Sequence, residues 1–183
     1  MEGFFCLGII TMWRIMETME TIIKILADGL MVPIVLLAAY VLIMKVPHAH
    51  RYDTYTRILM AGISSYLVAK LVGAVWQPEA VRPFEKLGIE AGAAFLNNPG
   101  FPSDHTLFAT FLTLAVWYAT KNGRLAAIMA GMTILVTVGR VLAHVHTPLD
   151  VTGGIVFAVI GSIWYIGLKK PHLRKHIAKK AKK

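Results

Sequence analysis

The residues of this chain best suited to chemistry are two histidines and two arginines. His105 ends the stretch FPSDH, His146 stands six residues after Arg140 in the stretch GRVLAHVHTPLD, and Arg82 begins the tripeptide RPF. A guanidinium offers a planar, permanently charged fork to phosphate, and histidine serves as a nucleophile or as a general acid and base. Phosphoryl transfer depends on positioning the phosphoryl group and stabilising its negative charge. These residue types therefore predict phosphoryl transfer.

Two of these segments also have a purely structural explanation. Ser103 is suited to capping the helix that is predicted after it, because serine accepts hydrogen bonds from the N–H groups of a first turn. Thr147, Pro148 and Asp150 have the form of a capping box with proline at the first helical position. Caps, however, require neither two arginines nor two histidines at one end of a bundle. The combination favours a site, in which Asp150 could orient the ring of His146 four residues before it.

Long apolar segments must position these side chains. Hydrophobic residues make up 56% of the 183 residues, which is high for a water-soluble domain. A bilayer core needs about 20 apolar residues per helix. Five segments meet this pattern once their flanks are included: roughly 22 to 44, 57 to 76, 106 to 120, 125 to 139 and 151 to 168. We therefore expect an all-α integral membrane bundle with about five transmembrane helices.

The two ends of the chain differ from these segments. The apolar run within residues 1 to 20 is short and ends at Arg14, which predicts an N-terminal interfacial amphipathic helix, with a signal anchor as the alternative. The tail at 169 to 183 carries most of the net charge of +9. A lysine cluster directly after a span favours anionic lipid head groups over nucleic acid as its partner. Cys6 is the single cysteine, which excludes an intrachain disulfide and a cysteine-based metal site.

The distribution of basic residues predicts the orientation. With the tail in the cytoplasm, thirteen of the 19 Lys and Arg residues lie on the cytoplasmic side, as the positive-inside rule expects. The other six cluster toward the outer face: Arg14, Lys24, Lys70, Arg82, Lys86 and Arg140. Charges at the outer ends of spans, against that rule, indicate a site that binds an anion. We expect a multi-pass protein of the cell membrane with an extracytoplasmic site and a cytoplasmic C-terminus.

Three short motifs together resemble a known family. The tripeptide RPF, the stretch FPSDH and the spacing Arg-x5-His-x3-Asp resemble the three-part signature of the type 2 phosphatidic acid phosphatase superfamily, which also contains the vanadium haloperoxidases. The resemblance covers roughly residues 57 to 168. With Asp104 where many members carry glycine, the motifs are similar to those of the undecaprenyl-diphosphatase branch, which serves bacterial cell-wall synthesis.

The resemblance implies a role for each matching residue. His146 would attack phosphorus and form a phosphohistidine, Asp150 would orient it, and His105 would protonate the leaving group and then activate water. The phosphate would be held by Arg82, Ser103, Arg140 and main-chain N–H groups near Asp104. No cofactor and no metal is implied, because the arginines take the place of the usual cation.

The chain departs from the family pattern at two positions. The lysine often found seven residues before the first arginine is replaced by Val75, so Lys70 or Lys86 must supply that charge. We prefer Lys70 as a phosphate ligand, because a lysine within a span is costly unless it serves a polar cavity, although it could also extend to the membrane surface. The serine that often precedes the third-motif arginine is Gly139, which removes a hydroxyl contact.

Other charged residues near the predicted site have weaker claims. His144 lies four residues after Arg140, so it could share a helix face with Arg140 and contact the substrate, although we expect no contact. We interpret Asp28 as an interfacial or structural group and Glu85 and Glu90 as solvated loop charges. An acid beside a phosphate site repels the substrate unless it has a specific task, so Glu85 and Glu90 stay outside the predicted site.

These observations predict a membrane lipid phosphatase with its phosphatase domain over 21 to 168. Its substrate would be a polyprenyl diphosphate, in the first place undecaprenyl diphosphate, with the lipid tail between helices. The alternatives are a phosphatase for phosphatidic acid or phosphatidylglycerophosphate, a vanadate-dependent haloperoxidase, which is usually large and soluble, and a non-catalytic lipid carrier or flippase. Two histidines with Asp150 argue against a carrier, because carrying a phosphate needs no nucleophile.

Overall fold

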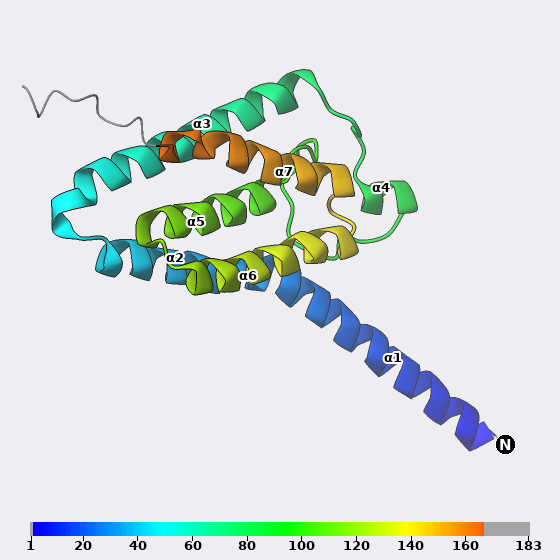
Figure 1. Cartoon of the computed structure of the whole chain (residues 1–183). Helices are drawn as coiled ribbons and strands as arrows, with labels where there is room; N and C mark the ends of the chain where they lie inside the picture. Colours follow the sequence, from blue (N-terminus) through cyan, green and yellow to red (C-terminus); the bar gives the residue numbers. More distant parts are fainter. Residues whose placement is uncertain (1, 167–183) are drawn as a thin grey trace, which may run out of the picture.

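Helices pack side by side in one bundle (Figure 1). The computed structural model describes residues 2 to 166, with side chains from residue 12 onward, and it contains no strand within that range. The bundle consists of α2 (Met31–Lys45), α3 (Arg51–Val75), α5 (Asp104–Thr120), α6 (Gly123–Leu142) and α7 (Pro148–Gly161). Helix α5 lies at the centre, because it contacts the other four. The predicted all-α membrane bundle is confirmed.

Four helical segments in the described part of the chain are long and apolar enough to cross a membrane: Met12–Lys45, His48–Val75, Gly123–Leu142 and Pro148–Tyr165. The remaining expected span, α5, has 17 residues. That length corresponds to about 25 Å, slightly less than a hydrocarbon core of about 30 Å. Helix α5 contacts the four other helices of the bundle, so the shortest of the five segments is also the central one.

The N-terminal helix continues into the first span without a break. Helix α1 (Glu2–Lys24) passes through one π-helical turn, η1 (Ile25–Gly29), and then into α2. No proline or glycine interrupts residues 9 to 28, which explains why no boundary appears near residue 20. Helix α1 projects away from the bundle (Figure 1), with exposed apolar side chains such as Trp13. Its interfacial location stays a prediction, and the basic tail at 169 to 183 lies outside the described residues.

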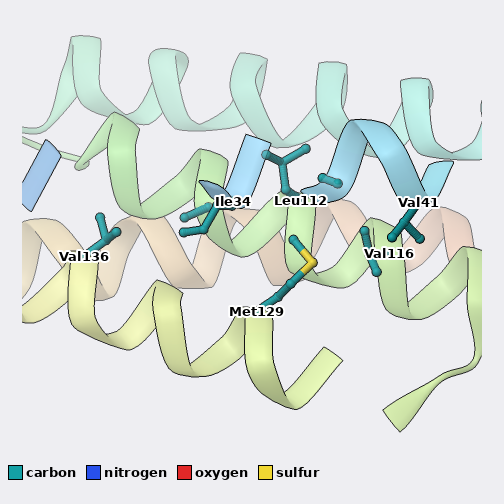
Figure 2. Close-up of a cluster of buried hydrophobic side chains, with 8 residues drawn as sticks. Ile34, Val41, Leu112, Val116, Met129 and Val136 are labelled. Carbon is teal, nitrogen blue, oxygen red and sulfur yellow. The ribbon is translucent and has the colours of Figure 1, made fainter. Parts of the chain in front are cut away.

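The main hydrophobic core joins α2, α5 and α6. Figure 2 shows side chains from these three helices pointing toward one another, including Ile34, Leu112 and Met129. Burial of such side chains excludes lipid as well as water from the centre of the bundle, so packing contacts hold the helices together. This core lies on one side of α5 and keeps that helix fixed relative to α6.

Three further short elements complete the described part of the chain: η2 (His48–His50), α4 (Pro83–Leu87) and η3 (Ser162–Tyr165). Helix α4 and the loops on both sides of it lie at the end of the bundle where α5 and α7 begin and α6 ends (Figure 1). The three predicted motifs are located there. Residues far apart in sequence therefore meet at one end of the helices.

Candidate active site

His146 lies in the turn between α6 and α7, and the start of α7 supplies its partner. Thr147 Oγ1 accepts a hydrogen bond from the Asp150 N–H at 3.2 Å, and Asp150 Oδ2 accepts one from the Thr147 N–H at 2.8 Å. The capping box is therefore present. The same Asp150 Oδ2 lies 3.6 Å from Nδ1 of His146, and both side chains are buried. One carboxylate caps a helix and also faces the histidine ring.

Burial keeps His146 neutral. It lowers the pKa of His146 below the ordinary value, whereas the Asp150 carboxylate raises this pKa and offsets part of the shift. The charges of Arg140 and Arg82 lower the pKa further. With Nδ1 directed at Asp150, the opposite nitrogen, Nε2, is free to react, and a neutral imidazole is the nucleophilic form.

Ser103 stands at the cap position of α5, but its hydroxyl does not cap the helix. The residue is fully buried, and Oγ has no hydrogen-bond partner among the described residues. Its main-chain N–H donates to the Asp150 carbonyl oxygen at 3.0 Å. This contact requires Gly154, where a Cβ would lie 2.7 Å from the Ser103 carbonyl oxygen. A buried hydroxyl without a partner and the N–H groups of a first helical turn are suited to binding an anion.

Arg82 holds three loop segments together at the site. Its Nη1 donates to the Val145 carbonyl oxygen at 2.6 Å. Its Nη2 donates to the Leu96 carbonyl oxygen at 3.1 Å and to two oxygens of Asn98 at 3.1 and 3.0 Å. Burial lowers the pKa of Arg82 and nearby carboxylates oppose that shift, so the side chain remains charged at neutral pH. Much of its fork is thus occupied by the protein itself.

Lys70 on α3 forms an ion pair with Asp104 in the first turn of α5. Lys70 Nζ lies 2.8 Å from each carboxylate oxygen, and both side chains are partly exposed. Lys86, the other replacement for the family lysine, pairs instead with Glu79 at 2.6 Å. The structure places Lys70 beside the predicted site residues and Lys86 outside them.

Arg140 and His105 meet at a residue outside the predicted site, Asp28 in η1. Arg140 is 1% exposed, and its Nη1 donates to Asp28 Oδ1 at 2.6 Å. The same oxygen lies 3.7 Å from Nε2 of His105. The Ala94 N–H donates to Asp28 Oδ2 at 2.8 Å. Asp28 could have been found from the sequence, because an acid within an apolar span is costly and typically functional.

A cavity of about 150 Å³ brings these groups together. The charged residues and histidines that line this cavity are Lys70, Arg82, Asp104, His105, Arg140 and His146. Ser103 and Asp150 are not part of the lining, but Asp150 contacts His146 from behind. Three cationic side chains and two histidines around one small cavity can bind a phosphoryl group and transfer it.

The weaker candidates do not line this cavity. His144 has a positive φ of 57°, and its Nδ1 lies 2.8 Å from the Leu142 carbonyl oxygen. Glu85 accepts a hydrogen bond from the Arg82 N–H at 3.2 Å and caps α4, whereas Glu90 is exposed. Over residues 2 to 166, no group of three or more His, Cys, Asp or Glu side chains is arranged to hold a metal ion.

A second, larger hollow reaches the same place. An apolar groove of about 1030 Å³ runs along α3 and α5, and Asp104 and His105 line both the groove and the cavity. Other lining residues, such as Leu59 and Phe108, are exposed on the outside of the bundle. The apolar groove and the charged cavity therefore meet at the first turn of α5.

Comparison with known proteins identifies the family of this chain. The family model described as "PAP2 superfamily" matches residues 54 to 172. A protein of Escherichia coli (strain K12) named "Putative undecaprenyl-diphosphatase YbjG" is 34% identical over 87 residues, which cover 45% of this chain and 41% of that protein. The aligned region thus spans about two fifths of that relative's length, and no solved structure matches the chain significantly. Because the family model covers well over half of the chain, including all three motifs, the chain belongs to the PAP2 superfamily.

Proposed function

We propose that the protein is a membrane lipid phosphatase. His146 attacks phosphorus, the bond between phosphorus and the leaving oxygen breaks, and His105 gives that oxygen a proton. Water then attacks the phosphohistidine with His105 as the base, which releases phosphate and restores both histidines. The observation that carries the proposal is the position of both histidines on one small cavity with Arg140 and Lys70. Those charges stabilise the negative transition state without a bound metal.

The chemical class of the substrate follows from the groove. An apolar groove that meets a phosphate-binding cavity suits a lipid whose tail stays in the groove while its head reaches His146. We propose a polyprenyl diphosphate, specifically undecaprenyl diphosphate, from which the terminal phosphate is removed to give undecaprenyl phosphate. The E. coli relative carries the name of this activity. Such a reaction would return a lipid carrier to bacterial cell-wall synthesis.

We further propose that the site faces the outside of the cell membrane. Lys121 and Arg124 lie at the start of α6, and Arg140 lies near its end, beside the cavity. The end of the bundle that carries Lys121 and Arg124 therefore lies opposite the site, and basic residues favour the cytoplasmic side. In this orientation the enzyme acts on lipid that is exposed at the outer surface.

One assay tests both the activity and the substrate. Purified protein in vesicles is offered undecaprenyl diphosphate, phosphatidic acid and phosphatidylglycerophosphate side by side, and released phosphate is measured. We expect the fastest release from undecaprenyl diphosphate. A clear preference for either glycerophospholipid would replace the proposed substrate but keep the chemistry. A protein that binds these lipids and releases no phosphate from any of them would be a carrier.

The nucleophile is tested with a matched pair of histidine variants. His146→Asn should release no phosphate but should still bind the diphosphate lipid, because Arg140 and Lys70 are unchanged. His144→Asn is the control, since His144 lies two residues away and does not line the cavity. Asparagine also tolerates the positive φ of that residue. Full activity in His146→Asn would overturn the assignment of His146 as the nucleophile.

A further inference from the structure

We propose that Asp28 is a positioning residue that orients Arg140 and places a negative charge beside the ring of His105. None of the three family motifs contains this residue. The inference rests on the proposed phosphatase function, since it assigns Asp28 a task within that reaction. Two observations carry it: the contacts of the Asp28 carboxylate, and the close packing that brings η1 against α6.

The Asp28 carboxylate is held from two sides. Oδ2 accepts a hydrogen bond from the Ala94 N–H at 2.8 Å, and Oδ1 accepts one from Nη1 of Arg140 at 2.6 Å. A carboxylate with a fixed main-chain donor on one oxygen and a buried arginine on the other has little freedom to turn away. Asp28 therefore sets the direction of the Arg140 fork, which must be aligned before phosphate can bind.

A glycine makes this arrangement possible. At Gly139 a Cβ would lie 2.6 Å from the Ala27 nitrogen and 2.9 Å from the Ala27 Cα, so any larger residue would push η1 away from α6. Ala27 is fully buried at this contact. Asp28 follows Ala27 in the sequence and Arg140 follows Gly139, so this contact brings Asp28 and Arg140 together. The glycine that stands in place of the family serine thus admits a carboxylate to the site.

The charge of Asp28 acts on His105. Its Oδ1 lies 3.7 Å from His105 Nε2, where a negative charge favours the protonated ring. The charged and titratable groups around His105 come from every neighbouring element: Asp28 from η1, Arg140 from α6, His146 from the α6–α7 turn, Asp104 from α5 itself, and Lys70 from α3 through its pair with Asp104. Burial of the ring and the charges of Arg140 and His146 oppose protonation, whereas Asp28 and, more weakly, the Lys70-paired Asp104 favour it. Asp28 thus places a negative charge beside the ring nitrogen of His105, where it stabilises the proton that His105 gives to the leaving oxygen.

Asp28→Asn removes the charge at nearly the same size, and its one acceptor oxygen can serve either the Ala94 N–H or Nη1 of Arg140 but not both. With a lipid substrate we expect kcat to fall at least about tenfold, because general acid catalysis contributes about a hundredfold or more. KM should change less than kcat, because loss of the negative charge favours phosphate binding while a less well aligned Arg140 opposes it. The alkaline limb of the rate profile, which requires protonated His105, should move to lower pH by about one unit. With p-nitrophenyl phosphate, whose leaving group needs little protonation, the loss should be smaller, because only the alignment of Arg140 is then affected.

Two variants serve as controls. Glu79→Gln neutralises another paired carboxylate, that of the Glu79–Lys86 pair outside the cavity, and should change none of these quantities. Asp28→Glu keeps the charge but moves it by one methylene, so it should retain the alkaline limb with a reduced kcat. Asp28→Glu also keeps the test decisive if Asp28→Asn does not fold.

A separate measurement follows the protonation of His105 in the absence of catalytic turnover. In the full chain labelled at histidine, the His105 imidazole resonance is titrated by NMR and assigned with His105→Gln. Its midpoint should fall by about one pH unit in Asp28→Asn and stay in place in Glu79→Gln. Wild-type protein that releases no phosphate from any lipid would refute the phosphatase, whereas this titration would still decide the role of Asp28.

Three results would overturn the role of Asp28. The first is an equal loss with both substrates and an unmoved alkaline limb, which would show that Asp28 only supports the fold. The second is a gain in kcat/KM at all pH values, which would show that the carboxylate competes with phosphate for Arg140. The third is an unmoved NMR midpoint in Asp28→Asn.

Discussion

The contact between η1 and α6 can be tested by adding one carbon atom at Gly139. In Gly139→Ala the new Cβ would lie 2.6 Å from the Ala27 nitrogen and 2.8 Å from the Leu26 carbonyl carbon. Both are main-chain atoms of a helical turn, so no side chain can rotate to relieve the clash. The η1 segment must move, and the 2.6 Å hydrogen bond between Asp28 and Arg140 must lengthen or break.

The size of the effect follows from two opposing contributions. Alanine is favoured over glycine within a helix by about 1 kcal/mol, whereas forcing an extra carbon into a packed contact costs about 1 to 3 kcal/mol. Gly131→Ala isolates the first contribution, because Gly131 lies on the same helix and a Cβ there would meet nothing within 4 Å. The two variants should therefore differ by about 1 to 3 kcal/mol in unfolding free energy. A difference of this size shifts Tm by several degrees in a protein of this length.

Thermal unfolding in detergent and phosphate release are measured on both variants. Gly131→Ala should match or slightly exceed the wild type in stability and should keep full activity. Gly139→Ala should unfold several degrees lower and should lose activity with the lipid substrate, because Arg140 loses its partner. If Gly139→Ala is as stable and as active as Gly131→Ala, then η1 does not lie against α6 as described.

Four further results are expected. Arg140→Lys should lower the rate about a hundredfold to a thousandfold, as for removal of one oxyanion donor, because lysine lacks the fork; near-normal turnover would show that a point charge suffices. Activity should persist in excess EDTA, because Arg82, Arg140 and Lys70 supply the positive charge, and loss restored by a divalent ion would contradict this expectation. Burial lowers the pKa of His146, so the neutral form of this residue persists into mild acid. The acid limb of kcat/KM should therefore have its midpoint below the ordinary histidine value of about 6.5, and a midpoint above 7 would contradict the burial argument. In a Cys6→Ser background, an impermeant thiol reagent added to intact cells should label Asn98→Cys but not Lys183→Cys, and the reverse pattern would invert the proposed orientation.

Motif spacing and hydrophobic length predicted much of this molecule. The five apolar segments form the bundle, and the capping box at Thr147 is present because its residues act within four positions of one another. The same local reasoning predicted a cap at Ser103, where the hydroxyl is buried and does not cap. That difference arises from the packing of α7 against α5 at Gly154, which no local pattern records.

The position of Asp28 beside Arg140 could not be predicted from the sequence. Its place in the site depends on a π-helical turn and on the close approach of η1 to Gly139, which lies more than 100 residues away in the chain. The choice between Lys70 and Lys86 likewise needed the position of Asp104 relative to α3. Both cases depend on distances between helices, whereas periodicity and spacing describe one helix at a time.

The meeting of the apolar groove with the charged cavity has a kinetic consequence. Exposed lining residues such as Leu59 and Phe108 place the groove on the lipid-facing side of α3 and α5, so a substrate can reach His105 by lateral diffusion within one leaflet. The rate should then follow the mole fraction of substrate in the membrane rather than its amount per volume of buffer. Adding unreactive phospholipid at constant total substrate should slow the enzyme, whereas diluting intact vesicles with buffer should leave the rate per vesicle unchanged.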